Sequence, residues 1–227
     1  MIRLVLFDVD ATLIHTGGAG VKAFARALAG EFGANDGVER VKFAGRTDVS
    51  LARELFSLHQ IEASPKNFGR FFQAYLVWLE QLLRDCKGGP CPGVLEFQGA
   101  LEALPEPPLL GLLTGNIREG ARLKLQRFNL WEKFPFGAFG DEDEDRDRIA
   151  VIARQRGSER LGRPLRGEEI LVVGDTPFDI RCARAIQARM LAVGSGTFSV
   201  AELLTHKPDW AAADLTGIRV AEVMGTA

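Results

Sequence analysis

The chain has 227 residues, 46% of them hydrophobic, which is enough for one large domain or for a domain with an insert. Its formal net charge of −2 argues against a nucleic-acid partner, although a local pocket can still bind a small phosphorylated metabolite. No apolar stretch approaches the roughly 20 residues of a membrane helix, and three cysteines are too few for a disulfide framework. We therefore expect a cytoplasmic protein without a membrane partner. The sequence does not indicate the oligomeric state.

The first predicted element is a buried strand over residues 2–7 (IRLVLF), which is short and almost continuously apolar. A glycine-rich loop follows it. Apolar residues then recur at helical spacing and predict helices around residues 21–32, 51–58 and 68–83, with no convincing strand between residues 15 and 87. We therefore expect an inserted α-helical cap over residues 15–91.

From residue 94 onward, predicted helices alternate with predicted strands. The helices lie near 94–104, 117–128, 147–157, 178–187 and 199–205, and the strands at 109–114, 136–139, 169–174, 189–194 and 209–212. Such alternation predicts a doubly wound, Rossmann-like α/β core with a parallel sheet, formed by residues 1–14 and 92–227. In these sheets the ligand crevice lies beyond the carboxyl ends of the strands.

Three of the predicted strands end in polar residues that would meet at that edge. They end at Asp8 and Asp10 in DVDAT, at Thr114 in LLTGN, and at Asp175 and Asp179 in GDTPFD. Four carboxylates cannot stay ionised together in a crevice without a cation, and their oxygens suit Mg²⁺. The alternative is that each aspartate caps a helix. Because such aspartates follow more than one predicted strand, the metal site is favoured over separate helix caps.

These motifs, in this order, resemble those of the haloacid dehalogenase-like hydrolase superfamily. The first motif of that family, Asp-x-Asp-x-Thr, matches DVDAT, and its second and fourth motifs match LLTGN and GDTPFD. The resemblance covers essentially the whole chain and is closest to phosphoglycolate phosphatase-like members with a helical cap. It implies a phosphatase that uses Mg²⁺ and acts on a small phosphate monoester.

The resemblance also implies a role for each motif residue. Asp8 would be the nucleophile that forms an aspartyl-phosphate, and Asp10 would be the general acid and then the general base. Thr114 would bind the transferring phosphoryl oxygens. The metal would be held by Asp8, by the backbone carbonyl of Asp10, by Asp175 and, through water, by Asp179. Phosphate-binding groups are also expected at Thr12, Gly115 and Asn116.

The third motif of the family is a cation, which has to lie between the second and fourth motifs. The candidates are Lys124, Lys133, Arg146, Arg148 and Arg154. Arg146 is the preferred one because it stands just before a helix that leads to the fourth motif, and Arg148 is the second choice. An arginine can bind phosphate bidentately, and the acidic residues 143–147 could orient it. The alternative is a solvated arginine in a charged loop.

The predicted cap carries GRTDVS, residues 45–50, between two of its helices. In resembling phosphatases such a loop faces the active site, so Arg46 could meet a substrate anion and Thr47 or Asp48 could form a hydrogen bond with it. Alternatively, Thr47 or Asp48 caps the following helix. His15 and Thr16, at the hinge, are further candidates for the cleft lining.

One position departs from the family pattern: Ala11 stands where glycine is common. If φ is positive there, alanine costs about 1 kcal/mol or more. Together with a non-lysine cation, Ala11 lends some support to a non-catalytic phosphate-binding regulator. Within the superfamily, a phosphotransferase or phosphomutase and a 2-haloacid dehalogenase are also alternatives, although Asp10 argues against the dehalogenase.

Overall fold

The computed structural model describes residues 1–225 and contains a six-stranded parallel sheet with β1 (Leu4–Phe7) inside it. The other strands are β4 (Leu109–Leu113), β5 (Gly137–Ala138), β6 (Ile170–Gly174), β7 (Arg189–Val193) and β8 (Trp210–Ala212). Their order is β5-β4-β1-β6-β7-β8, and β1 pairs in parallel with both β4 and β6. The chain thus winds away from β1 in both directions, which confirms the doubly wound α/β core.

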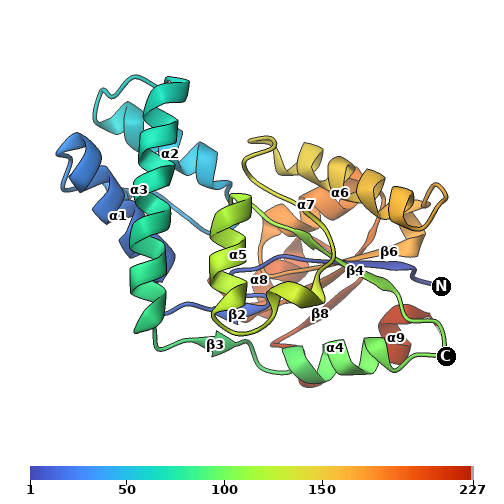
Figure 1. The fold of residues 1–227 in the computed structure, drawn as a ribbon. Coiled ribbons are helices and arrows are strands. Elements are labelled where there is room, and N and C mark those ends of the chain that lie inside the picture. The colour runs from blue at the N-terminus through green and yellow to red at the C-terminus, as the bar shows by residue number, and fades with distance from the viewer. Residues whose placement is uncertain (226–227) are drawn as a thin grey trace.

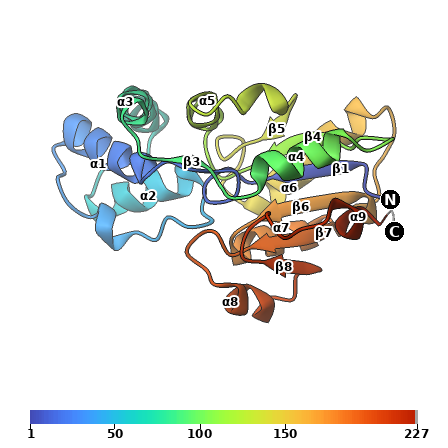
Figure 2. The ribbon, with the colours of Figure 1, turned by 90° about the horizontal axis from the view of Figure 1, so that it is seen from below.

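Side chains of β1 alternate between two separate apolar clusters. Val5 and Phe7 pack in one cluster, and Leu4 and Leu6 in the other. The first cluster is covered by α4 (Val94–Glu102), α5 (Arg118–Gln126) and α9 (Val220–Met224), and the second by α6 (Arg146–Arg160), α7 (Pro177–Ala185) and α8 (Val200–Thr205). Both sheet faces are therefore buried, which explains why the strands are continuously apolar (Figure 2).

Three helices lie beside the sheet rather than on its faces: α1 (Ala19–Phe32), α2 (Asp48–Leu58) and α3 (Pro65–Arg84). They have a core of their own, in which the ring of Phe24 lies 4.8 Å from that of Tyr75 and 5.1 Å from that of Phe71, centroid to centroid. Figures 1 and 2 place them at the end of the sheet opposite the two chain termini. That end holds the carboxyl ends of the strands.

A short antiparallel ribbon joins the helical block to the sheet. It consists of β2 (Ile14–His15) and β3 (Gly89–Pro90), paired Ile14 to Pro90 and His15 to Gly89. The sequence did not predict this ribbon, because two residues a strand are too few to show alternation. The division into a cap of residues 15–91 and a core of residues 1–14 and 92–227 stays our proposal.

The remaining elements are short. They are the 3₁₀ turns η1 (Val38–Arg40), η2 (Trp131–Lys133) and η3 (Gly167–Glu169). Across residues 1–225, every helix is too short or too polar to span a bilayer.

Candidate active site

Three carboxylates from two strand ends and one helix converge at the edge of the sheet. Asp8 follows β1, Asp175 follows β6, and Asp179 lies in the first turn of α7. All three are buried, and one carboxylate oxygen from each lies within 4.8 Å of the others. The predicted meeting of the first and fourth motifs is therefore present in space.

The start of α7 explains how Asp179 is placed. Thr176 precedes the helix, its hydroxyl accepts from the backbone N–H of Asp179 at 3.3 Å, and Oδ2 of Asp179 accepts from the N–H of Thr176 at 3.0 Å. This reciprocal capping box is worth about 1 kcal/mol of helix stability. Asp179 is therefore not the N-cap itself but the third residue of the capping box; only its Oδ2 is used there, and Oδ1 points to Arg146.

Arg146 begins α6 and is buried, as the third motif requires. Its guanidinium forms a hydrogen-bonded ion pair with Asp179, and its Nη2 lies 3.7 Å from Oδ1 of Asp8. Arg148, the second choice, is exposed and pairs with Asp143. Among the described residues, no hydrogen bond or ion pair links the Arg146 side chain to its acidic neighbours in the run 143–147, so the expectation that these neighbours orient Arg146 is wrong. Asp179 holds the guanidinium instead, because it approaches from the facing helix α7.

The buried carboxylates are short of positive charge. Burial, more than any neighbour, raises the pKa of Asp8 from 3.8 to about 7 although Arg146 lowers it, and burial also raises the pKa of Asp175, with Asp179 and Asp8 adding to the effect. Oδ1 of Asp8 is buried and has no hydrogen-bond partner among the described residues. An orphaned carboxylate oxygen inside an acidic cluster is the arrangement that a hard divalent cation would satisfy.

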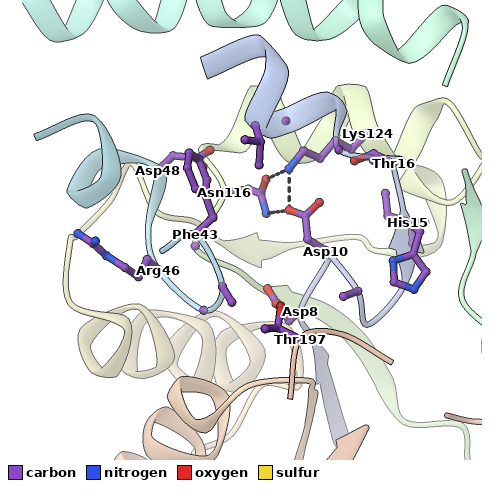
Figure 3. A pocket seen from close by; sticks show the side chains of 18 of the residues that line it. Asp8, Asp10, His15, Thr16, Phe43, Arg46, Asp48, Asn116, Lys124 and Thr197 are labelled. Carbon is purple, nitrogen blue, oxygen red and sulfur yellow. Dashed lines mark hydrogen bonds and ion pairs between the residues drawn. The ribbon is translucent and has the colours of Figure 1, made fainter. Parts of the chain in front are cut away.

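Asp10 lies apart from this acidic cluster. Its Oδ2 accepts from Lys124 Nζ at 2.6 Å and from Asn116 Nδ2 at 2.9 Å, and Lys124 also donates to Asn116 Oδ1 at 2.5 Å (Figure 3). Burial opposes the charge of Lys124, but Asp10 and Asp48 outweigh burial, so the pKa of Lys124 is raised and the side chain is an ammonium. The Asp10 carboxylate is therefore neutralised by lysine, and any contact with a metal is left to its backbone carbonyl.

The charge count at the sheet edge supports a divalent ion. The four predicted carboxylates, Asp8, Asp10, Asp175 and Asp179, face two buried cations, Arg146 and Lys124. Two negative charges remain, which a single Mg²⁺ would balance. The donor set therefore fits this metal.

Thr114 lies beneath Asp8, fully buried. Its hydroxyl accepts from Asn116 Nδ2 at 2.9 Å, and its polar side chain also lowers the pKa of Asp8, against the larger effect of burial. The neighbouring Gly115 is approached so closely by the cap that a Cβ would collide with the carbonyl of Arg46, and its own carbonyl accepts from the N–H of Asp48 at 2.7 Å. The second motif thus contacts both the nucleophile candidate and the cap.

Three predicted substrate-binding residues are used otherwise. The hydroxyl of Thr12 donates to Asp175 Oδ1 at 3.3 Å, so Thr12 supports a carboxylate instead of facing the cavity. Thr47 caps α2, accepting from the N–H of Ser50, which selects the capping interpretation. The guanidinium of Arg46 is ion-paired with Glu54 and points away from Asp8 (Figure 3), because the cap supplies its own counter-charge.

A cavity of about 440 Å³ connects these groups to the cap. Asp8 and Asp175 lie at its sheet end, and His15 and Thr16 line it beside the hinge, as predicted. Its cap side is lined by side chains that the sequence did not single out as site residues, namely Phe24, Phe43, Leu51, Tyr75 and Lys87. The helical spacing of Phe24, Leu51 and Tyr75 indicated only a cap core, and Phe43 and Lys87 lie outside the helices.

Ala11 adopts a positive φ of 60°, in the left-handed region that an alanine side chain disfavours. We expect Ala11→Gly to raise the free energy of unfolding by about 0.5–1 kcal/mol, since relief of backbone strain exceeds the added entropy of the unfolded chain. Urea denaturation of both proteins measures this difference. A destabilised glycine variant would show that the positive φ is not strained.

The raised pKa of Asp8 predicts a pH effect on the metal-free protein. Between pH 4 and pH 7 the folded state keeps a proton on Asp8 that the unfolded chain has released, so stability falls as the pH rises through this window. Thermal unfolding in EDTA should show a smaller fall for Asp8→Asn than for the wild type. Parallel pH profiles for the two proteins would contradict the assignment.

Comparison with known proteins identifies the family of this chain and proteins that share its fold. The sequence model of the haloacid dehalogenase-like hydrolases matches residues 5–193. A protein of Caldanaerobacter subterraneus subsp. tengcongensis, named as a candidate pyrophosphatase (PpaX), is 27% identical over 94% of this chain and 91% of its own length.

Solved structures share the fold at lower identity. CbbY from Rhodobacter sphaeroides in complex with phosphate has a TM-score of 0.80 and 18% identity, covering 99% of this chain and 100% of that one. A predicted phosphoglycolate phosphatase from Haemophilus somnus has a TM-score of 0.75 and 19% identity, covering 100% and 98% of the two chains. The fold, including the helical block, is therefore common to all three proteins.

Proposed function

The chain belongs to the haloacid dehalogenase-like hydrolase family, and from this premise we propose that it hydrolyses a small organic phosphate monoester with the aid of Mg²⁺. One observation carries the proposal: the buried Asp8 carboxylate, which has an unpartnered oxygen, lines a cavity beside two other carboxylates and an arginine. Nucleophilic attack on phosphorus needs such a carboxylate with its surroundings already arranged around it.

In the first step, an oxygen of Asp8 forms a bond to phosphorus while the ester P–O bond breaks. Asp10, protonated when the substrate binds, donates this proton to the departing alcohol oxygen, and Asn116 and Lys124 hold its side chain in place for the transfer. Thr114 and the backbone amides after β4 bind the phosphoryl oxygens, while Arg146 offsets negative charge next to Asp8.

In the second step, water attacks the phosphorus of the aspartyl-phosphate. Asp10 takes a proton from that water, the bond between Asp8 and phosphorus breaks, and inorganic phosphate leaves. The same carboxylate therefore serves as acid and then as base. The cap contacts the core through bonds such as the hydrogen bond from Asp48 N–H to Gly115 O, and so covers part of the cavity.

Asp8, Asp175 and Asp179 would hold Mg²⁺, with the backbone carbonyl of Asp10 as a further ligand. When bound, the ion supplies positive charge that offsets the phosphoryl oxygens and the carboxylates around them. Thr12 keeps Asp175 in position for this role through its hydroxyl.

Several features bear on the substrate and on the alternatives. The named relatives are a candidate pyrophosphatase, a protein crystallised with phosphate and a predicted phosphoglycolate phosphatase, which supports a small phosphorylated metabolite. A dehalogenase would have no use for the Asp10–Lys124 pair, and a pure phosphate binder would not need Asp10.

Three unpaired cysteines favour the cytoplasm as the compartment.

Removal of the metal tests the proposal. We expect EDTA to lower the turnover of p-nitrophenyl phosphate at least about 100-fold, because without a divalent cation the negative charge of the transferring phosphoryl group is not offset. Adding Mg²⁺ should restore the rate and also raise the thermal midpoint of the wild type. Asp175→Asn should abolish that rise in midpoint. Full activity in EDTA would overturn the metal dependence.

A further inference from the structure

The cap side of the cavity contains a buried hydroxyl without a partner. Tyr75, the only tyrosine of the sequence, is fully buried in α3, lines the cavity, and its Oη has no hydrogen-bond partner among the described residues. The hydroxyl reaches the core helix α5, where a Cβ at Gly120 would lie 3.3 Å from it. Burial above all, and then Asp48 and Asp10, raise the pKa of Tyr75, so it is a neutral phenol that can donate a hydrogen bond.

Asp48 provides an acceptor in the same cavity. It is buried at the start of α2, and its Oδ2 accepts from the N–H of Ile117 at 2.9 Å. No hydrogen bond to its other oxygen, Oδ1, is found among the described residues, and the residue lines the cavity together with Tyr75 (Figure 3 shows Asp48). A donor and an acceptor without protein partners therefore share one chamber.

The buried cation of this chamber is already paired. Asp10 and the oxygen of Asn116 accept from Lys124 at 2.6 and 2.5 Å. Burial raises the pKa of Asp48 to about 7, although Lys124 lowers it, so near neutral pH its side chain can form a hydrogen bond with a neutral polar group. An alcohol hydroxyl can accept from Tyr75 and donate to the carboxylate form of Asp48.

We propose, resting on the proposed phosphatase function, that Tyr75 and Asp48 select a leaving alcohol that carries further hydroxyl groups. The substrate class is then the monophosphate of a polyol or sugar, in preference to esters with an apolar leaving group. The cavity of about 440 Å³ is larger than a phosphoryl group alone needs, so it has room for such an alcohol.

The test compares esters of equal carbon number with and without hydroxyls: glycerol 3-phosphate with propyl phosphate, ribose 5-phosphate with pentyl phosphate, and sorbitol 6-phosphate with hexyl phosphate. We expect kcat/KM of the wild type to favour the hydroxylated member of at least one pair by about tenfold or more, since a buried polar group left unpaired penalises the analogue. Tyr75→Phe and Asp48→Asn should each lower this ratio about tenfold, mainly through KM.

Phe72→Leu is the matched control. It alters cap packing beside Tyr75 without removing a hydroxyl, and the ratio should stay at the wild-type value. Tyr75→Phe should also unfold at a higher temperature than the ligand-free wild type, because it removes an unpaired buried hydroxyl. Ratios near one in all three pairs, a preference for 2-phosphoglycolate, or ratios unchanged in both site variants would overturn the inference.

A second measurement separates this inference from the proposed function. Calorimetry of the Asp8→Asn protein with Mg²⁺ gives the affinities for the same paired esters without turnover. If the wild type hydrolyses no ester, including p-nitrophenyl phosphate, the phosphatase proposal fails, while tighter binding of the hydroxylated esters would still support the selectivity of Tyr75 and Asp48. Equal affinities within every pair would refute it.

Discussion

Asp8→Asn is expected to lower kcat for p-nitrophenyl phosphate by a factor of about 10⁴ or more, because the amide cannot form the aspartyl-phosphate. The substitution is nearly isosteric. It removes a carboxylate whose burial raises its pKa to about 7, so the metal-free variant should be at least as stable as the wild type. Steady-state kinetics in Mg²⁺ and thermal unfolding in EDTA measure both effects.

A folded Asp8→Asn protein with more than about 1% of wild-type activity would show that Asp8 is not the nucleophile. Asp143→Asn is the matched control, since it makes the same chemical change in the acidic run, where the half-buried Asp143 pairs with the exposed Arg148. Its kcat should stay within about twofold of the wild type, because it contacts none of the reacting groups.

Arg146→Met is expected to cost about 3–5 kcal/mol of unfolding free energy, because it leaves Asp8 and Asp179 buried without their shared cation. Activity should fall about 10³-fold as well, since the charge beside the phosphoryl site is lost. Arg146→Lys keeps the positive charge but loses the planar guanidinium with its paired N–H donors. We therefore expect it to be more stable than Arg146→Met and less stable than the wild type. Urea denaturation and kinetics on the three proteins test this order.

Arg148→Met distinguishes the two arginines that the sequence left as candidates. The Arg148 side chain is 75% exposed and, within residues 1–225, pairs only with Asp143 at 3.4 Å, so its loss should change stability by less than about 0.5 kcal/mol. Equal effects of the two substitutions, on stability or on rate, would show that Arg146 has no special place in the site.

The sheet and the acidic cluster could be predicted from the sequence because their signals are local. A strand buried on both faces is continuously apolar, as β1 and β6 are, and an aspartate directly after such a strand lies at the carboxyl edge. The position of Arg146 just before a helix was likewise a local signal, and the structure brings this side chain to Asp179 and Asp8.

The cap side of the site could not be predicted, because its residues acquire their partners only through tertiary packing. In the sequence, Tyr75 occupies one more apolar position of an amphipathic helix, and nothing local shows that it lines a cavity with its hydroxyl unpartnered. Lys124 was one of five candidate cations, and its reach to Asp10 depends on where α5 packs. The pairing of Arg46 with Glu54, eight residues away, depends on how the loop enters α2.

The central claim is that Asp8 attacks phosphorus beside a magnesium ion. A crystal structure with Mg²⁺ and beryllium trifluoride, which mimics a phosphoryl group bound to a carboxylate, tests it most directly. The account predicts beryllium bonded to an oxygen of Asp8, with Mg²⁺ held by Asp8 and Asp175. Beryllium trifluoride bound elsewhere in the cavity, with the Asp8 carboxylate turned away from it and from the metal, would contradict the account.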